Sequence, residues 1–278
     1  MALNDSSGKE ERMITQIENE YFEAYSRFRS EMDMMKELNK QLPRSIKKIC
    51  GKKLEKIKKK IGSKKEIEKE IGFMSAQLKK LVSEVDDEAK ILFEASEEAE
   101  KLFFDLIKTA SHRIKFIEFI RNMSLIYLAT ELESFLRSVL SLSFEYKPEI
   151  LATCQKSISY EELAKYSTIE EARQDIMEKE ISTLLYRDIE EVSRYFEQKF
   201  NIKLSELTEW KKFKEIFYRR NILVHNSAIV NEIYRSKTEY TGKKEILDVS
   251  YHYLNKSINL CDKFAEYLSK QLTQKFSK

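Results

Sequence analysis

The sequence predicts an all-α protein, and two features of its composition support this fold class. With Gly 5 and Pro 2 in 278 residues, the chain contains few of the residues that interrupt helices. Hydrophobic residues make up 42% of the chain, which is enough for a packed core. Along most of the chain they recur at the helical spacing of three and four residues. We therefore expect a helical bundle with an N-terminal helical extension.

The N-terminal part has the pattern of amphipathic helices that lead into a coiled coil or helical hairpin. The first apolar stripe runs from residue 13 to about residue 42, and Pro43 is expected to end or bend that helix. A second stripe ends at a break at Gly62-Ser63. A seven-residue repeat then follows, formed by Ile67, Ile71, Met74, Leu78, Leu81 and Val85. The spacing leaves open whether this seam pairs within one chain or between two.

Charge is divided sharply within this region. Residues 44–65 contain eleven basic residues and one acid, a net charge of +10, whereas residues 84–105 have a net charge of −7. The two segments could pair with each other, or the basic one could hold the phosphate backbone of RNA. The second interpretation assigns RNA contacts to Lys47, Lys48, Lys52, Lys56, Lys59 and Lys60. Since residues 44–65 contain no aromatic residue, base stacking is not predicted there.

The C-terminal part predicts a bundle of several further helices. A long core helix is expected from Ile114 to about residue 144, and the capping-box spacing after Ser167-Thr168 opens another. A third is expected over residues 186–200, and a fourth is expected to be capped by Ser205 or Thr208. The last runs from residue 250 to about residue 276. We therefore expect an N-terminal region over residues 1–112 and a bundle over residues 113–278.

Arg220, Asn221 and His225 form the one pattern in the chain that specifies chemistry. The spacing of four places Asn221 and His225 on one helical face, within reach of the long Arg220 side chain. A permanent cation then lies beside a group that titrates near neutrality. This pair suits cleavage of a phosphodiester, because imidazole can transfer the proton of a ribose hydroxyl while guanidinium neutralises phosphoryl charge. Arg and His near a helix C-terminus also interact favourably with the helix dipole, so a capping role is the alternative.

The Arg-Asn-x-x-x-His helix resembles the signature of the HEPN superfamily, whose active members are metal-independent ribonucleases. The segments Asn226–Tyr234 and Glu133–Leu136 resemble that family as well. The resemblance implies a homodimer in which two motif helices form a composite cleft. It also implies His225 as acid or base, Arg220 as phosphate ligand, Asn221 as an orienting group, and Glu133 as the residue that holds the arginine or tunes the imidazole. Arg219 lies outside the pattern and is expected to be a second phosphate contact.

Other classes of function are not indicated. The chain lacks a His-x-x-x-His pair, a Cys-x-x-Cys spacing and a phosphate-binding glycine loop, so neither a metal nor a cofactor is expected. No apolar run is long enough for a membrane span, and the N-terminus does not resemble a secretory signal, so a cytoplasmic protein is expected.

Two hypotheses about the function remain. The first is an RNA-cleaving toxin or antiviral-defence effector, with a regulatory or antitoxin-like protein as a further partner. The second is a non-catalytic dimerisation or RNA-binding module with a partner-recruiting arm.

Overall fold

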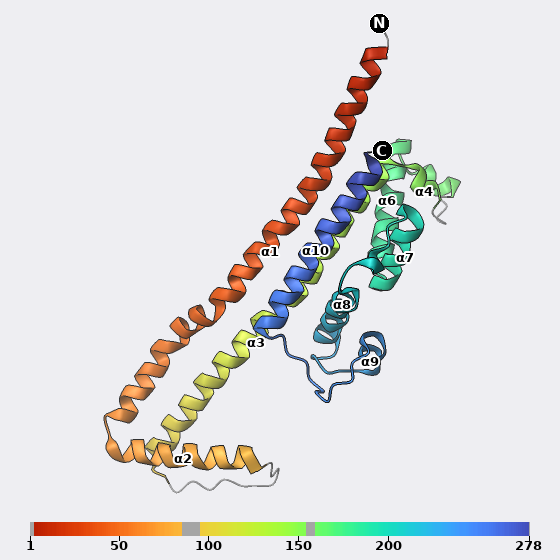
Figure 1. The fold of residues 1–278 in the computed structure, drawn as a ribbon. Coiled ribbons are helices and arrows are strands. Elements are labelled where there is room, and N and C mark those ends of the chain that lie inside the picture. The colour runs from red at the N-terminus through yellow and green to blue at the C-terminus, as the bar shows by residue number, and fades with distance from the viewer. Residues whose placement is uncertain (1–2, 85–94, 154–158, 278) are drawn as a thin grey trace. The chain divides into compact units, whose positions relative to one another are not determined.

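The computed structural model describes residues 3–84, 95–153 and 159–277, with side chains from residue 12 onward except at residues 49 and 77–84. Its long helices are α1 (Leu3–Gly62), α2 (Lys65–Glu84), α3 (Glu97–Tyr146), α6 (Ile169–Leu185), α7 (Ile189–Phe200), α8 (Trp210–His225) and α10 (Tyr251–Phe276) (Figure 1). Short elements are α4 (Glu149–Ala152), α5 (Tyr160–Leu163), the 3-10 helix η1 (Leu204–Glu206) and α9 (Glu232–Thr238). Within these ranges the only bridge of β type joins Ile229 to Ile246, so the all-α class is confirmed. None of the described helices carries an apolar stretch that would cross a bilayer.

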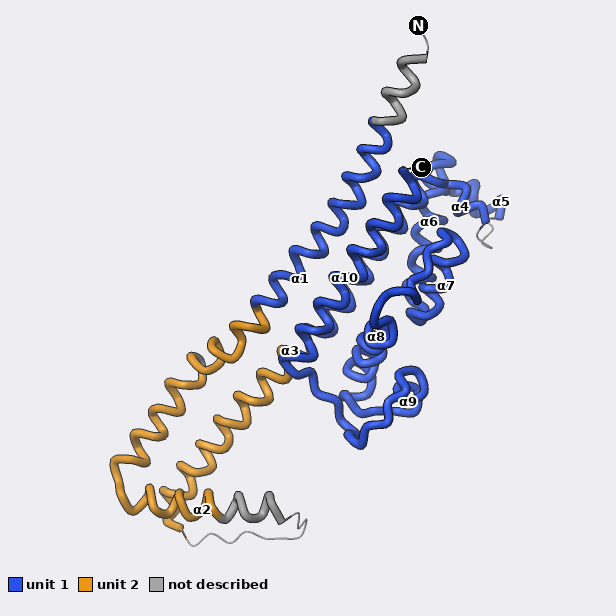
Figure 2. The backbone as a smooth tube through the Cα atoms, in the orientation of Figure 1, with its two compact units in different colours: residues 1–37, 121–278 blue, residues 38–120 orange. Residues whose placement is uncertain are grey.

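Internal contacts divide the chain into two compact units. Residues 1–37 and 121–278 form unit 1, and residues 38–120 form unit 2 (Figure 2). This division differs from the expected boundary between residues 112 and 113. That position lies inside α3, which is one continuous helix because its sequence contains no Gly or Pro. The separate core helix expected from Ile114 is therefore the second part of a longer one.

In unit 1, the first part of α1 packs with α3 and α10 (Figure 1). The Tyr21 hydroxyl lies 2.8 Å from the Ser143 hydroxyl, and Ser269 Oγ donates to the Tyr21 carbonyl at 2.9 Å. The rings of Phe28 and Phe135 are 5.4 Å apart. Each of these aromatic side chains contributes roughly 1.5–3 kcal/mol through burial. The N-terminal stripe that was assigned to an extension therefore forms part of the bundle core.

The helices that carry the candidate site have caps that set their ends. The helix predicted after Ser167-Thr168 is α6, and its N-cap is Thr168, which accepts a hydrogen bond from the Glu171 amide, rather than Ser167 paired with Glu170. Asp188 caps α7, and Asn201, in a left-handed conformation with φ 51°, ends it. The expected caps of α8 are wrong, since neither Ser205 nor Thr208 is its N-cap. Glu209 holds that position with φ 69° and no side-chain cap.

Unit 2 contains the second part of α1, α2 and the first part of α3. Pro43 does not end α1, which continues to Gly62 with Leu42 and Ile46 buried on either side of the proline. The predicted break at Gly62-Ser63 is confirmed. A small core contains Ile57, Ile61, Ile67, Ile71, Met74, Ala99, Leu102 and Phe103. The first half of the seven-residue seam is therefore buried within its own chain, while the side chains of Leu78, Leu81 and Val85 lie outside the described residues.

Candidate active site

The motif residues occupy the last turns of α8, a helix held in unit 1 by its apolar face. Phe213, Ile216 and Ile222 are buried, and the Phe213 ring stacks on Phe264 of α10 with 4.3 Å between centroids. The helix ends at His225, where the Asn226 amide donates to the Ile222 carbonyl at 2.9 Å. This packing fixes the direction in which the opposite face of α8 presents its polar side chains.

Arg220 contacts two of the residues that the resemblance groups with it. Its Nη2 donates to Glu133 Oε1 at 2.5 Å, and its Nη1 donates to Asn221 Oδ1 at 3.1 Å. Glu133 lies on α3, 87 positions earlier in the chain. The side chains of Arg220 and Glu133 are 24% and 33% exposed, so the pair is accessible from solvent. The guanidinium is thus held by two acceptors while part of the Arg220 side chain remains exposed to solvent.

The Glu133 carboxyl lies in a partly buried position that affects its charge. Burial raises its pKa above the ordinary value, and the Arg220 charge offsets only part of that effect. The geometry places Glu133 to hold Arg220, since the two side chains are in direct contact.

His225 is placed differently from Arg220. Its imidazole is exposed and, among the described residues, has no hydrogen-bond or ion-pair partner. Asn221, one turn earlier, is exposed as well. The described part of the chain thus joins Arg220, Asn221 and Glu133 by direct contacts, whereas no contact there connects His225 to them. Since the imidazole makes no capping hydrogen bond to these residues, it remains accessible to a ligand.

Arg219 has internal partners, and these replace the expected phosphate contact. Its Nε donates to Glu215 Oε1 at 2.7 Å, and its Nη1 donates to the Asp248 carbonyl at 3.2 Å. Its guanidinium also lies 4.1 Å from the centroid of the Tyr253 ring. The Arg219 side chain is only 12% exposed. We therefore assign Arg219 a structural role, which joins α8 to the start of α10.

Two tyrosines complete this cluster, which the motif alone does not reveal. Tyr253 donates to Glu215 Oε2 at 2.5 Å, and Tyr234 of α9 donates to the other oxygen of the same carboxylate. Burial raises the pKa of both phenols, so they remain protonated donors. The sequence indicated only one contact of this cluster, the ion pair between Glu215 and Arg219, through their spacing of four on a helix. The tyrosines lie on α9 and α10, so the spacing along α8 could not predict their contacts.

The segment after the motif is fixed by backbone hydrogen bonds. Ser227 and Ala228 adopt positive φ angles of 51° and 66°, and the Ala228 amide donates to the Ile222 carbonyl at 2.9 Å. The bridge between Ile229 and Ile246 ties this turn to the chain before α10. Large apolar side chains near the motif remain exposed, namely Val224, Ile229, Ile233 and Ile246. The surface beside His225 is therefore ordered and partly apolar.

A second polar cluster holds α8 against the start of α7. Tyr218 donates to both carboxylate oxygens of Asp188, at 2.8 and 2.9 Å, and Lys237 lies 3.3 Å from the same carboxylate. Burial alone would raise the pKa of Asp188, but hydrogen bonds from the Glu190 amide, Tyr218 and Lys237 lower it overall. The folded pKa is thus below the unfolded value of about 3.9. This contribution to stability is present above about pH 4 and is lost as the pH falls through the folded pKa.

We predict that Asp188→Asn lowers the free energy of unfolding by about 1–2 kcal/mol at pH 7, because a cap and a charged acceptor are weakened together. Urea unfolding at pH 7 and pH 3 should show a smaller loss of stability on acidification in this variant than in the wild type. Asp105→Asn, at an exposed position, is the matched control and should leave the pH dependence unchanged. Equal acid sensitivity of Asp188→Asn and the wild type would contradict the assignment.

The lysines predicted to contact RNA all lie in unit 2. Lys47, Lys48, Lys52, Lys56, Lys59 and Lys60 are exposed on α1. Among the basic residues of segment 44–65, the ion pair found in the described part joins Lys64 to Glu98 at 2.6 Å. That contact links the two charged segments at one point, while residues 85–94 of the acidic segment lie outside the described residues. The six lysines therefore present a basic face to solvent.

The described residues contain no group of three or more His, Cys, Asp or Glu side chains arranged to hold a metal ion. No model of a known protein family matches the chain, and searches of curated proteins and of solved structures gave no match.

Proposed function

We propose that this protein is a metal-independent endoribonuclease of the HEPN type. The observation that supports the proposal is the contact of Arg220 with both Glu133 and Asn221 near the end of α8. His225, one helical turn after Asn221, is exposed and has no partner in the described part of the chain. In this mechanism Glu133 and Asn221 orient the guanidinium, which neutralises charge on the phosphoryl oxygens. His225 accepts the proton of the ribose 2′-hydroxyl, and the 2′ oxygen attacks the adjacent phosphorus. The bond from phosphorus to the 5′ oxygen of the next nucleotide breaks, and that oxygen leaves with a proton from water.

The basic face of α1 supports RNA as the substrate. Its lysines provide charge without aromatic side chains, so they suit contact with phosphates and carry no sequence preference. Cleavage of cellular RNA by such an enzyme would be harmful without control. We therefore assign the protein to the toxin or antiviral-defence effectors, with a regulatory protein as a further partner.

We predict that RNA cleavage proceeds in excess chelator and leaves a cyclic phosphate end, and that RNA with deoxyribose at the scissile position is not cleaved.

Arg220→Lys should reduce kcat/KM by about 10²-fold or more, because an ammonium group cannot replace a planar bidentate contact. Arg137→Lys is the matched control, since Arg137 is an arginine of α3 outside the motif whose side chain is 40% exposed and pairs with Glu178 at 2.7 Å. Mass spectrometry of the products and initial rates measure both effects. A requirement for magnesium, or wild-type rates in Arg220→Lys, would exclude this mechanism.

We infer that the active form is a homodimer that meets at the C-terminal end of α8. Within one chain no contact joins His225 to Arg220 in the described part, so a second copy could complete the cleft. The exposed apolar side chains beside His225 provide a surface for this contact, as Ile246 is 59% exposed and Ile229 is 45% exposed. The seam of α2 is a weaker candidate, because its described half is already buried.

We predict that Ile246→Asp weakens the dimer at least tenfold and reduces cleavage at low protein concentration, since a charge in an apolar interface is unfavourable. Ile169→Asp is the control, because Ile169 is 83% exposed at the start of α6. Sedimentation velocity and rates measured over a range of protein concentrations report the two effects. A fully active monomer at micromolar concentration would rule out the composite cleft. The alternative of a non-catalytic module would be supported if the dimer bound RNA without cutting it.

A further inference from the structure

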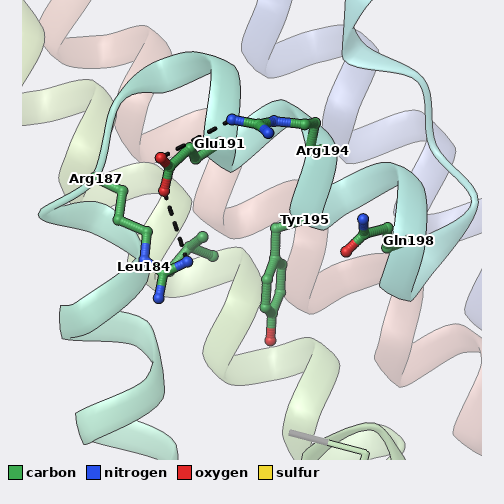
Figure 3. Close-up of a pocket in the computed structure, with 6 residues that line it drawn as sticks. All are labelled: Leu184, Arg187, Glu191, Arg194, Tyr195 and Gln198. Carbon is green, nitrogen blue, oxygen red and sulfur yellow. Dashed lines mark ion pairs between the residues drawn. The ribbon is translucent and has the colours of Figure 1, made fainter. Parts of the chain in front are cut away.

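A polar pocket lies on the outer face of α7, apart from the residues described above. It has a volume of about 290 Å³ and is lined by Leu184 of α6 together with Arg187, Glu191, Arg194, Tyr195 and Gln198 (Figure 3). Glu191, Arg194, Tyr195 and Gln198 lie on one face of α7, three or four residues apart across it, whereas Arg187 comes from the turn between α6 and α7. The opposite face of α7 carries Val192, Phe196 and Phe200, which are buried in the core of unit 1. The pocket is therefore built on a helix whose position is fixed by packing.

The two arginines of the pocket are held only weakly by their shared partner. Arg187 Nη1 lies 3.6 Å from Glu191 Oε2, and Arg194 Nη2 lies 3.9 Å from Glu191 Oε1. The pair of Arg220 with Glu133 is much shorter, at 2.5 Å. Arg187 and Arg194 are also 55% and 67% exposed, so each ion pair contributes little to stability. Arg194 Nε also donates a long hydrogen bond of 3.4 Å to the Glu190 carbonyl. Two guanidinium groups beside one carboxylate leave one excess positive charge in the pocket, and a phosphate can accept hydrogen bonds from both groups.

Tyr195 and Gln198 add groups that recognise a base. The Tyr195 ring packs against Phe200, with centroids 6.4 Å apart, which fixes its orientation. Figure 3 shows the Tyr195 ring between the Glu191 ion pairs and the Gln198 amide. Aromatic rings and guanidinium planes stack on unpaired bases, and an amide can both donate to and accept from a base edge. The basic segment of α1 has no aromatic residue and lacks this combination.

We propose that this pocket binds one unpaired nucleotide of RNA, with its phosphate on Arg187 and Arg194 and its base against Tyr195 and Gln198. The volume favours a single nucleotide, because pockets for larger ligands extend to about 1,000 Å³. The inference rests on the proposed function for the identity of the nucleic acid, and it adds a preference for single-stranded regions. The pocket belongs to the same unit as the motif, and α7 contacts α8 through Asp188 and Tyr218.

The test uses the 278-residue protein carrying His225→Ala, so that RNA is bound without being cut. Fluorescence anisotropy with a labelled single-stranded RNA should show that adding Arg187→Ala and Arg194→Ala weakens binding at least tenfold. The slope of log K against log salt should fall by roughly 0.7 for each phosphate that the variant no longer neutralises. Arg173→Ala with Lys179→Ala on α6 removes the same charge and should change affinity less than twofold. Since Arg187 and Arg194 are more than half exposed, the thermal unfolding transition should be unchanged.

A duplex RNA of equal length separates a nucleotide pocket from a general basic surface. Its affinity should not depend on Arg187 and Arg194, because paired bases cannot enter the pocket. Equal losses of affinity for single-stranded and duplex RNA, or affinity like that of the control variant, would overturn the proposal. Binding of an acidic peptide in place of RNA would overturn it as well. If the wild type binds RNA through the pocket but cuts none, the nuclease proposal fails and the pocket stands. If the wild type cuts RNA while the protein with Arg187→Ala and Arg194→Ala binds RNA as tightly as the control variant, the pocket proposal fails and the nuclease proposal stands.

Discussion

His225→Ala should reduce RNA cleavage by about 10³-fold or more while leaving the free energy of unfolding unchanged within about 0.5 kcal/mol. The imidazole is exposed and has no protein partner among the described residues, so its removal leaves neither a cavity nor an unsatisfied group. The loss in rate should appear in kcat, because proton transfer occurs only in the transition state. Initial rates and urea unfolding on the same preparations measure the two quantities.

His252→Ala provides the matched control for this prediction. His252 is also exposed and lies in the first turn of α10, outside the motif. It should cut RNA at the wild-type rate. Full activity in a folded His225→Ala protein would remove His225 from the mechanism, and an equal loss in both variants would indicate an indirect effect of losing a histidine in this region.

The fold class followed from composition, whereas the extent of the long helices did not. Few Gly and Pro residues predicted helices throughout. The helices expected after Ser167-Thr168 and from residue 250 begin at the N-caps Thr168 and Ser250. Pro43 was expected to end or bend α1, and the helix does not end there but continues to Gly62, with Leu42 and Ile46 buried on either side of the proline. The contacts of Tyr21 with Ser143 and Ser269 join segments far apart in sequence. The spacing of residues along one helix cannot predict these contacts between helices.

In the candidate site, too, the sequence did not predict the contacts between residues of different helices, except where the resemblance indicated them. The spacing of Asn221 and His225 predicts a shared helical face, and the resemblance placed Glu133 near Arg220, where the structure also has it. Arg219 was assigned to RNA because its buried partners could not be identified from the sequence alone. The pocket on α7 was also missed, since its polar residues read as the solvent face of an amphipathic helix. The placement of Glu191, Arg194, Tyr195 and Gln198 on one face of α7 was the available signal.

Glu215→Ala should lower the free energy of unfolding by about 3 kcal/mol, the largest stability effect that we expect from a single polar residue. The carboxylate accepts hydrogen bonds from Arg219, Tyr234 and Tyr253, and its side chain is only 19% exposed. Its removal leaves a buried guanidinium without its counter-ion and two phenols without their acceptor. Urea unfolding measures the loss. Lys211→Ala, at a 79% exposed position on the same helix, should cost less than about 0.5 kcal/mol.

A second substitution separates the charge effect from simple loss of packing. Adding Arg219→Met to Glu215→Ala removes the unpaired cation and should restore part of the stability, because an apolar side chain of similar volume avoids the cost of a buried charge. The same cluster joins α8 to α9 and to the start of α10, so Glu215→Ala should also loosen the turn after His225 and reduce cleavage. Hydrogen exchange of the Ala228 and Leu247 amides reports that loosening directly. If the double variant were less stable than Glu215→Ala alone, Arg219 would stabilise the unit through its packing on Tyr253 rather than through its ion pair.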